Sequence, residues 1–68
     1  MRTVVIQDDM IRLGQFVKLA GVVESGAEVK ALLLDGAIWV NDESESRRGR
    51  QLRRGDYVQI GNETIVVG

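Results

Sequence analysis

The sequence of 68 residues predicts an α+β fold in which two helices pack on a small, mostly antiparallel sheet. The expected order of elements is β-α-α-β-β-β. Two observations predict this class. Apolar residues recur every three or four positions within residues 13–35 and every second position in the segments predicted as strands after Gly36. A chain this short supports one compact core, so helices and strands share it. We therefore expect a single domain over residues 1–68.

The first strand and the first helix follow directly from the N-terminus. Residues 2–6 are mostly β-branched and predict a strand that ends at the polar residues 7–9. Residues 13–20 predict a helix, because their apolar side chains fall at positions i, i+3, i+4 and i+7. These side chains are Leu13, Phe16, Val17 and Ala20. Gly21 is well placed to end the helix.

A second helix is predicted from Ser25 to about Asp35. Ser25 is a suitable N-cap, and Glu28 three residues later completes a capping-box pattern. Gly36 follows the last turn and is expected to end the helix. The apolar stripe consists of Val29, Leu32 and Leu33. Two short helices with a brief connection predict a helical hairpin.

The remaining residues predict strands and turns. Residues 37–41 alternate in polarity and predict a strand, whereas residues 42–50 are polar and predict a loop or an irregular strand. Further strands are expected at 57–60 and 64–67. Turn signals separate them at Arg54-Gly55-Asp56 and at Gly61-Asn62.

Composition excludes several classes of function. The chain has no cysteine and no histidine, which removes the usual thiolate ligands, nucleophiles and general bases. We expect no catalytic activity, no metal site and no cofactor. No apolar run is long enough for a membrane helix, and no signal peptide is recognisable. We therefore expect a cytoplasmic protein without a membrane partner.

The strongest chemical signal is a cluster of arginines. Although the net charge is −1, five of the nine basic residues lie within residues 47–54. The guanidinium group matches phosphate oxygens and stacks on bases, so the cluster predicts nucleic-acid binding by an arginine-rich hairpin. The alternative is a solvated loop whose arginines pair with nearby acids. The five arginines are Arg47, Arg48, Arg50, Arg53 and Arg54, and the acids are Asp42, Glu43 and Glu45.

Each predicted helix also has a small polar face that carries a lysine. Gly14, Gln15 and Lys18 share one face of the first helix. The second helix has Lys30 between Ala27 and Ala31 on a similar face. Small residues would let a phosphate backbone come close to these lysines. The alternative is that both faces are the solvent side of amphipathic helices.

Trp39 and Tyr57 are out of phase with the apolar residues of their strands, so we expect both to be partly exposed. An exposed aromatic ring can stack on an unpaired base. More often, such a ring covers the rim of a small core. The sequence leaves both interpretations open.

Four phrases together resemble the S4 domain, an RNA-binding module found in a ribosomal protein, pseudouridine synthases and some tRNA synthetases. They are LGQFVKLAGVV, SGAEVKALL, DGAIWVN and RRGDYVQI, and the similarity covers residues 12–60. The phrases are most similar to those of the short, stand-alone S4 proteins of bacteria. The resemblance implies an S4-like (αL) fold. It also implies RNA contacts by Lys18, Lys30, Arg47, Arg48, Arg50 and, less directly, Arg53.

The sequence departs from the family pattern in two places. Gly26 stands where many S4 domains have arginine after the capping serine, and Asp42 replaces the glycine of the usual turn. We expect Asn41 to take the left-handed conformation at that turn, because asparagine adopts it more readily than most residues.

These observations predict a non-catalytic, monomeric module for structured RNA, such as ribosomal RNA or a stem–loop. Binding would use the basic faces of the two helices and the arginine-rich segment. Two alternatives stay open. One is a protein-interaction module with the S4 fold, and the other is a helper that assists an RNA-modifying enzyme in trans.

Overall fold

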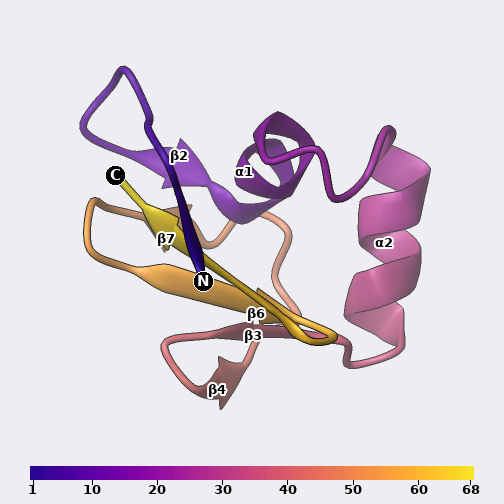
Figure 1. Cartoon of the computed structure of the whole chain (residues 1–68). Coiled ribbons are helices and arrows are strands. Elements are labelled where there is room, and N and C mark those ends of the chain that lie inside the picture. The colour runs from indigo at the N-terminus through magenta and orange to yellow at the C-terminus, as the bar shows by residue number, and fades with distance from the viewer.

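The computed structural model describes residues 1–68 and confirms the α+β class, with two helices and a mostly antiparallel sheet (Figure 1). The predicted order is incomplete, because three strands of two residues each also form. The elements are β1 (Arg2–Val4), β2 (Ile11–Arg12), α1 (Leu13–Leu19), α2 (Gly26–Leu34), β3 (Ile38–Val40), β4 (Glu43–Ser44), β5 (Gln51–Leu52), β6 (Tyr57–Ile60) and β7 (Glu63–Val67). A strand of two residues is too short to produce a recognisable alternation, so β2, β4 and β5 left no pattern in the sequence.

The strands form a sheet of five and a separate pair. The larger sheet has the order β1-β7-β6-β3-β4, and β2 pairs with β5. The first and last strands, β1 and β7, run parallel, with Arg2 opposite Ile65 and Val4 opposite Val67. The other three pairs in the larger sheet are antiparallel. This arrangement brings the two ends of the chain together in one sheet.

Both helices begin and end where the sequence predicts. The Ser25 hydroxyl accepts a hydrogen bond of 3.3 Å from the Glu28 amide, which confirms the predicted N-cap. The Glu28 carboxylate accepts from the amide of Glu24, one residue before the cap. Gly21 and Gly36 follow the helix ends with φ of 75° and 69°, a backbone conformation that glycine adopts without a steric penalty.

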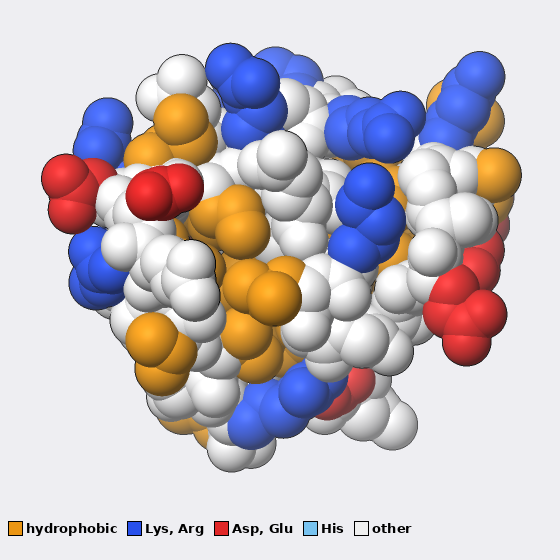
Figure 2. All heavy atoms as spheres, turned by 90° about the horizontal axis from the view of Figure 1, so that it is seen from above, with side chains coloured by type: hydrophobic (Ala, Val, Ile, Leu, Met, Phe, Trp, Pro, Cys, Tyr) orange, Lys and Arg blue, Asp and Glu red, His pale blue; other side chains and the backbone are white.

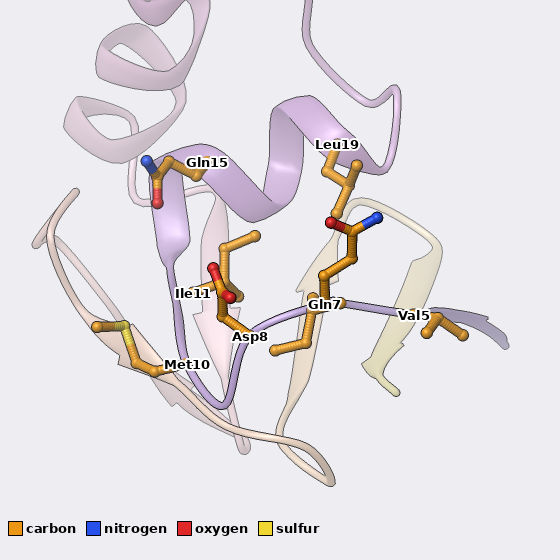
Figure 3. Close-up of a pocket in the computed structure, with 8 residues that line it drawn as sticks. Val5, Gln7, Asp8, Met10, Ile11, Gln15 and Leu19 are labelled. Carbon is orange, nitrogen blue, oxygen red and sulfur yellow. The ribbon is translucent and has the colours of Figure 1, made fainter.

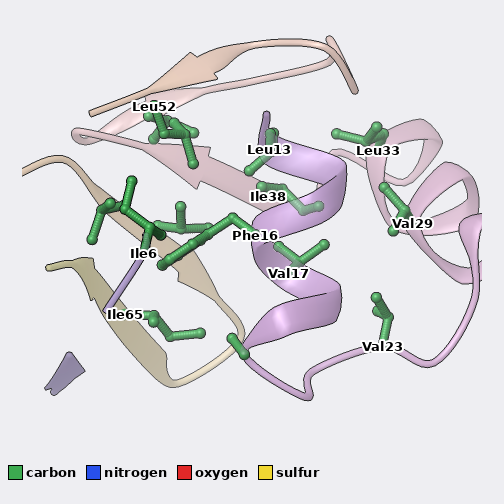
Figure 4. Close-up of a cluster of buried hydrophobic side chains, with 14 residues drawn as sticks. Ile6, Leu13, Phe16, Val17, Val23, Val29, Leu33, Ile38, Leu52 and Ile65 are labelled. Atoms are coloured by element: carbon green, nitrogen blue, oxygen red, sulfur yellow. The ribbon is translucent and has the colours of Figure 1, made fainter. Parts of the chain in front are cut away.

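A single cluster of 14 buried side chains forms the core, and α1 lies at its centre (Figure 4). The predicted stripe of α1 is buried throughout. Phe16 lies on the side of the sheet strands, where Ile65 is also found, and Val17 lies toward Val29 of α2. In α2, Val29 and Leu33 are buried and Leu32 is half-buried. The helical hairpin is therefore fixed to the sheet mainly through α1.

Asn41 and Asp42 form the two-residue turn between β3 and β4. Their φ values are 49° and 69°, so the expected left-handed conformation of Asn41 is confirmed and extends to Asp42. Two consecutive left-handed residues are typical of the tight turns that join antiparallel strands. The Asn41 side chain donates to Asp56 and accepts from the amide of Tyr57, at 3.1 and 3.0 Å. The turn is thus attached to the start of β6.

Neither helix is long and apolar enough to cross a membrane.

Candidate nucleic-acid interface

The arginine-rich segment does not form the hairpin that we expected. β4 pairs with β3, whereas β5 pairs with β2, so residues 45–50 cross from the larger sheet to the two-stranded sheet. The carbonyl oxygens of Arg48 and Arg50 accept hydrogen bonds of 3.0 and 2.8 Å from the amides of Gly14 and Leu13. The first amides of a helix have no partner within the helix, and here the loop supplies it. The loop is therefore held against the N-terminus of α1.

Glu45 organises the start of this loop. It is 5% exposed, and its carboxylate accepts hydrogen bonds from the amides of Ser46 and Arg47 and from the guanidinium groups of Arg47 and Arg50. The hydrogen bond from the Arg47 side chain, helped by Arg50, lowers the pKa of Glu45 to about 2 despite the opposing effect of burial. The same contact raises the pKa of Arg47.

Part of the positive charge of the arginine cluster is therefore compensated by Glu45. Pairing with this acid is what the alternative of a solvated loop predicts. Arg47 and Arg50 together carry two positive charges against the one negative charge of Glu45. The side chain of Arg47 nevertheless remains 71% exposed. It can contact a partner while it stays paired with Glu45.

Arg48 occupies a different position, over two glycines of the helical hairpin. A Cβ atom built on Gly14 would lie 2.9 Å from the Cγ of Arg48. A Cβ atom built on Gly26 would lie 2.6 Å from its Nη2. The side chain of Arg48 thus lies across the N-terminal ends of both helices, in space that only glycine leaves free. Gly26, a departure from the family pattern, makes room for the guanidinium group of Arg48.

A basic hollow of about 350 Å³ opens beside Arg48. Its lining contains no acidic and no hydrophobic residue. Three cations line it: Lys18 and Arg48, which the sequence predicts as RNA contacts, and Arg12, which the sequence does not predict. The lining residues are Arg12, Gly14, Gln15, Lys18, Arg48 and Gly49. Arg12 is isolated in the sequence, and it reaches the arginine-rich segment because β2 pairs with β5, where Arg12 lies opposite Gln51.

The other predicted contacts lie around this basic hollow rather than within it. Lys30 shares a second hollow of about 390 Å³ with Arg48, Ser46 and Leu34. Arg47 and Arg50 line a third hollow of about 540 Å³, which meets the basic hollow at Gly49. Arg48 therefore lines both the hollow that contains Lys18 and the hollow that contains Lys30. Gly49 lines both the hollow that contains Lys18 and the hollow that contains Arg47 and Arg50.

Arg53 and Arg54 lie outside these hollows and differ from each other. The guanidinium group of Arg54 donates to the carbonyl oxygen of Ile6 at 2.8 Å and contacts Asp9 at 3.5 Å. Arg54 therefore ties the turn before β6 to the segment after β1. The backbone amide of Arg53 donates to Asp56, whereas its side chain is in none of the ion pairs.

Most of the cations that are in no ion pair lie near α1, α2 and the loop. The four ion pairs of the structure are Arg2–Glu63, Arg47–Glu45, Arg50–Glu45 and Arg54–Asp9. Five cations are in none of them: Arg12, Lys18, Lys30, Arg48 and Arg53. Figure 2 shows lysine and arginine side chains along one edge of the face that contains α1, next to a band of hydrophobic side chains.

The two amphipathic aromatics lie away from the basic hollow. Trp39 is 44% exposed, as expected from its phase in the strand, and Tyr57 is half-buried. The Tyr57 hydroxyl donates a hydrogen bond to Asp42, which raises the pKa of Tyr57. Tyr57 therefore covers the turn between β3 and β4. Whether Trp39 stacks on a base stays a prediction.

A basic loop fixed to a two-helix hairpin on a small sheet matches a known class of domain. The chain belongs to the S4 domain family, whose model matches residues 4–68. It is also similar to the probable ribosome maturation protein RlbA of Bacillus subtilis (strain 168). The two are 51% identical over 55 residues, which cover 81% of this chain and 78% of the relative. Both findings confirm the resemblance that the four sequence phrases predict.

Proposed function

We propose that the chain is a non-catalytic module that binds structured RNA, ribosomal RNA in particular. The binding surface would be the basic face of α1, α2 and the loop 45–50. The observation that carries this proposal is the basic hollow, where Arg12, Lys18 and Arg48 meet without an acidic neighbour. Cations that have no internal partner are available to phosphate groups. Membership of the S4 domain family and the similarity to a probable ribosome maturation protein support RNA as the source of these phosphates.

The proposed contacts would differ in strength, because some of the cations are in an ion pair and others are not. Arg48, Lys18, Lys30 and Arg12 would hold backbone phosphates, because none of them is in an ion pair. Arg47 and Arg50 would make weaker contacts, since Glu45 already accepts hydrogen bonds from both. Arg53 would extend the contact beyond the hollows. The proposal assigns no catalytic residue.

The salt dependence of binding tests this proposal. We would measure RNA affinity by fluorescence anisotropy over a range of salt concentrations, using a ribosomal RNA stem–loop as the probe. Each phosphate contact contributes roughly 0.7 to 0.9 to the log–log slope. The triple variant Arg12/Lys18/Arg48→Ala should lose about 2 to 3 from the slope. An unchanged slope and affinity in this variant would overturn the proposal.

A protein partner is the second candidate, and two exposed side chains favour it. Trp39 and Leu34 are large hydrophobic residues on the surface. Affinity capture before and after nuclease treatment separates the candidates. A defined protein that survives nuclease treatment and is lost in Trp39→Ala or Leu34→Ala would support the second candidate. A partner that disappears with nuclease treatment would support RNA binding.

A further inference from the structure

A hollow beside α1 has no role in the phosphate contacts proposed above. Five of its eight lining residues are hydrophobic and three are polar, and we call it the apolar hollow. It has a volume of about 490 Å³ and lies between the segment that follows β1 and the exposed side of β2 and α1 (Figure 3). Val5, Ile11 and Leu19 contribute apolar surface to it. Val5 and Leu19 are 73% and 55% exposed, so their apolar surface is accessible to a ligand.

This apolar hollow and the basic hollow share one lining residue. Gln15 of α1 lines both of them. One wall of the apolar hollow is therefore one turn of helix away from Lys18, which lines the basic hollow. An RNA strand whose phosphate is held by Lys18 and Arg48 would bring its neighbouring base within reach of Leu19 and Ile11. One ligand with an anionic part and a flat apolar part could therefore contact both hollows on either side of Gln15.

The polar groups around the apolar hollow match the edge of a base. Gln7, Asp8 and Gln15 line it together with the apolar side chains, and the side chains of Asp8 and Gln15 lie on the same side of it in Figure 3. All three residues are exposed, and Asp8 is in none of the four ion pairs. Unpaired bases in RNA are commonly recognised through hydrogen bonds to their edges. The three side chains are free to make such bonds.

We propose that the apolar hollow holds an unpaired guanine of the RNA whose phosphates lie in the basic hollow. The two oxygens of an ionised carboxylate only accept hydrogen bonds. Guanine presents two adjacent donors on its Watson–Crick edge, its N1–H and its amino group, so it can donate to both oxygens of Asp8. The corresponding edges of adenine, cytosine and uracil place an acceptor beside each donor. The amide groups of Gln7 and Gln15 can donate to the guanine O6, while Leu19 and Ile11 cover the ring.

This inference rests on the proposed RNA-binding function, and the experiment separates the two. The probe is a short RNA hairpin with one bulged nucleotide, made as four versions with guanine, adenine, cytosine or uracil at the bulge, and as a fully paired parent. The readout is the ratio of affinities between each bulged hairpin and the parent, measured by fluorescence anisotropy. We expect the guanine bulge to bind at least about 5-fold more tightly than the other versions, the lower range for a bidentate contact.

Three variants locate the effect. Asp8→Asn should remove the preference for guanine, and Leu19→Ser should bring all bulged hairpins close to the affinity of the parent. Asp9→Asn is the matched control, because Asp9 is the neighbouring acid but does not line the hollow. Both acid variants lose one negative charge, and Asp9→Asn also releases Arg54 from its ion pair, so each variant should bind all versions of the RNA more tightly by a common factor. The affinity ratio cancels this common effect. Leu19 is more than half exposed, so its replacement should leave the fold intact.

The outcomes are distinct. Equal affinities for bulged and paired hairpins, with salt dependence and loss of binding in Arg12/Lys18/Arg48→Ala retained, would overturn the base pocket but keep the RNA-binding function. Equal preference for all bulged bases would overturn the assignment of guanine. Binding that is insensitive to both salt and the triple variant would overturn the RNA-binding function, and the base pocket with it.

Discussion

The backbone amide of Gly14 donates a hydrogen bond of 3.0 Å to the carbonyl oxygen of Arg48. This contact joins the first turn of α1 to the loop 45–50, which carries three of the seven arginines. It also brings the Arg48 side chain over the surface of Gly14 and on to Gly26 of the second helix. The position of Arg48 therefore depends on one backbone hydrogen bond and on the lack of a Cβ atom at Gly14 and at Gly26.

Replacing Gly26 by alanine should displace Arg48 without unfolding the protein. The added Cβ would lie 2.6 Å from the Nη2 of Arg48, at the mobile end of a long side chain. We expect the free energy of unfolding to change by less than about 1 kcal/mol, because alanine is also the better helix former. RNA affinity should fall to nearly the level of Arg48→Ala.

A double-mutant cycle checks this explanation. In the background of Arg48→Ala, the further change Gly26→Ala should have almost no effect on RNA affinity, since the displaced group is already absent. Additive losses of affinity in the double variant would show that Gly26 acts independently of Arg48.

Glu45 should make stability dependent on pH in the acidic range. Its pKa is lowered from 4.5 to about 2 in the folded protein, so its carboxylate stabilises the fold above pH 4.5. This contribution is lost as the pH falls from 4.5 towards 2. Because Arg47 is largely exposed, solvent screening reduces the contribution to about 1–2 kcal/mol. Urea unfolding of wild type and Glu45→Gln should differ by this amount at pH 7 and should converge at low pH.

The control for Glu45 is its neighbour Glu43, which is exposed and in no ion pair. Glu43→Gln should change stability little at any pH. If Glu45→Gln and wild type keep the same difference in stability between pH 7 and pH 2, the ion pairs of Glu45 do not stabilise the fold.

Arg53 and Arg54 are adjacent but should have separate roles. Arg54→Ala removes a hydrogen bond to Ile6 and should lower the free energy of unfolding by about 1 kcal/mol. Its effect on the salt slope of RNA binding should be small. Arg53→Ala should leave stability within about 0.5 kcal/mol and reduce the slope by roughly 0.7 to 0.9. The opposite assignment of the two effects would contradict the geometry described here.

The turn between β3 and β4 should be sensitive at Asn41 and tolerant at Asp42. Asn41→Ala removes two hydrogen bonds at a left-handed position and should cost about 2 kcal/mol of stability. Asp42→Gly relieves a left-handed residue and should be neutral or stabilising by up to about 1 kcal/mol. Thermal unfolding of both variants measures the contrast. If Asp42→Gly lowered stability more than Asn41→Ala, the hydrogen bond from Tyr57 to Asp42 would contribute more to the stability of this turn than the two hydrogen bonds of Asn41.

Short-range patterns determined much of the fold from the sequence alone. The stripe of Leu13, Phe16 and Val17, the cap at Ser25 and the left-handed Asn41 each depend on residues within about four positions of one another. Contacts of this kind can be predicted from the spacing of neighbouring residues in the sequence. The motif phrases also indicated the S4 family, since their order follows the order of these local elements.

Only the tertiary structure decided which charges act together. Glu45 was one of several acids that could pair with the arginines, and its burial selects Arg47 and Arg50 as partners. Arg12 joins Arg48 because two strands of two residues pair across the chain. The parallel pairing of β1 with β7 is equally remote in the sequence. Contacts between residues that are far apart in the sequence form only when the whole chain folds around one core. They therefore produce no periodic pattern in the sequence.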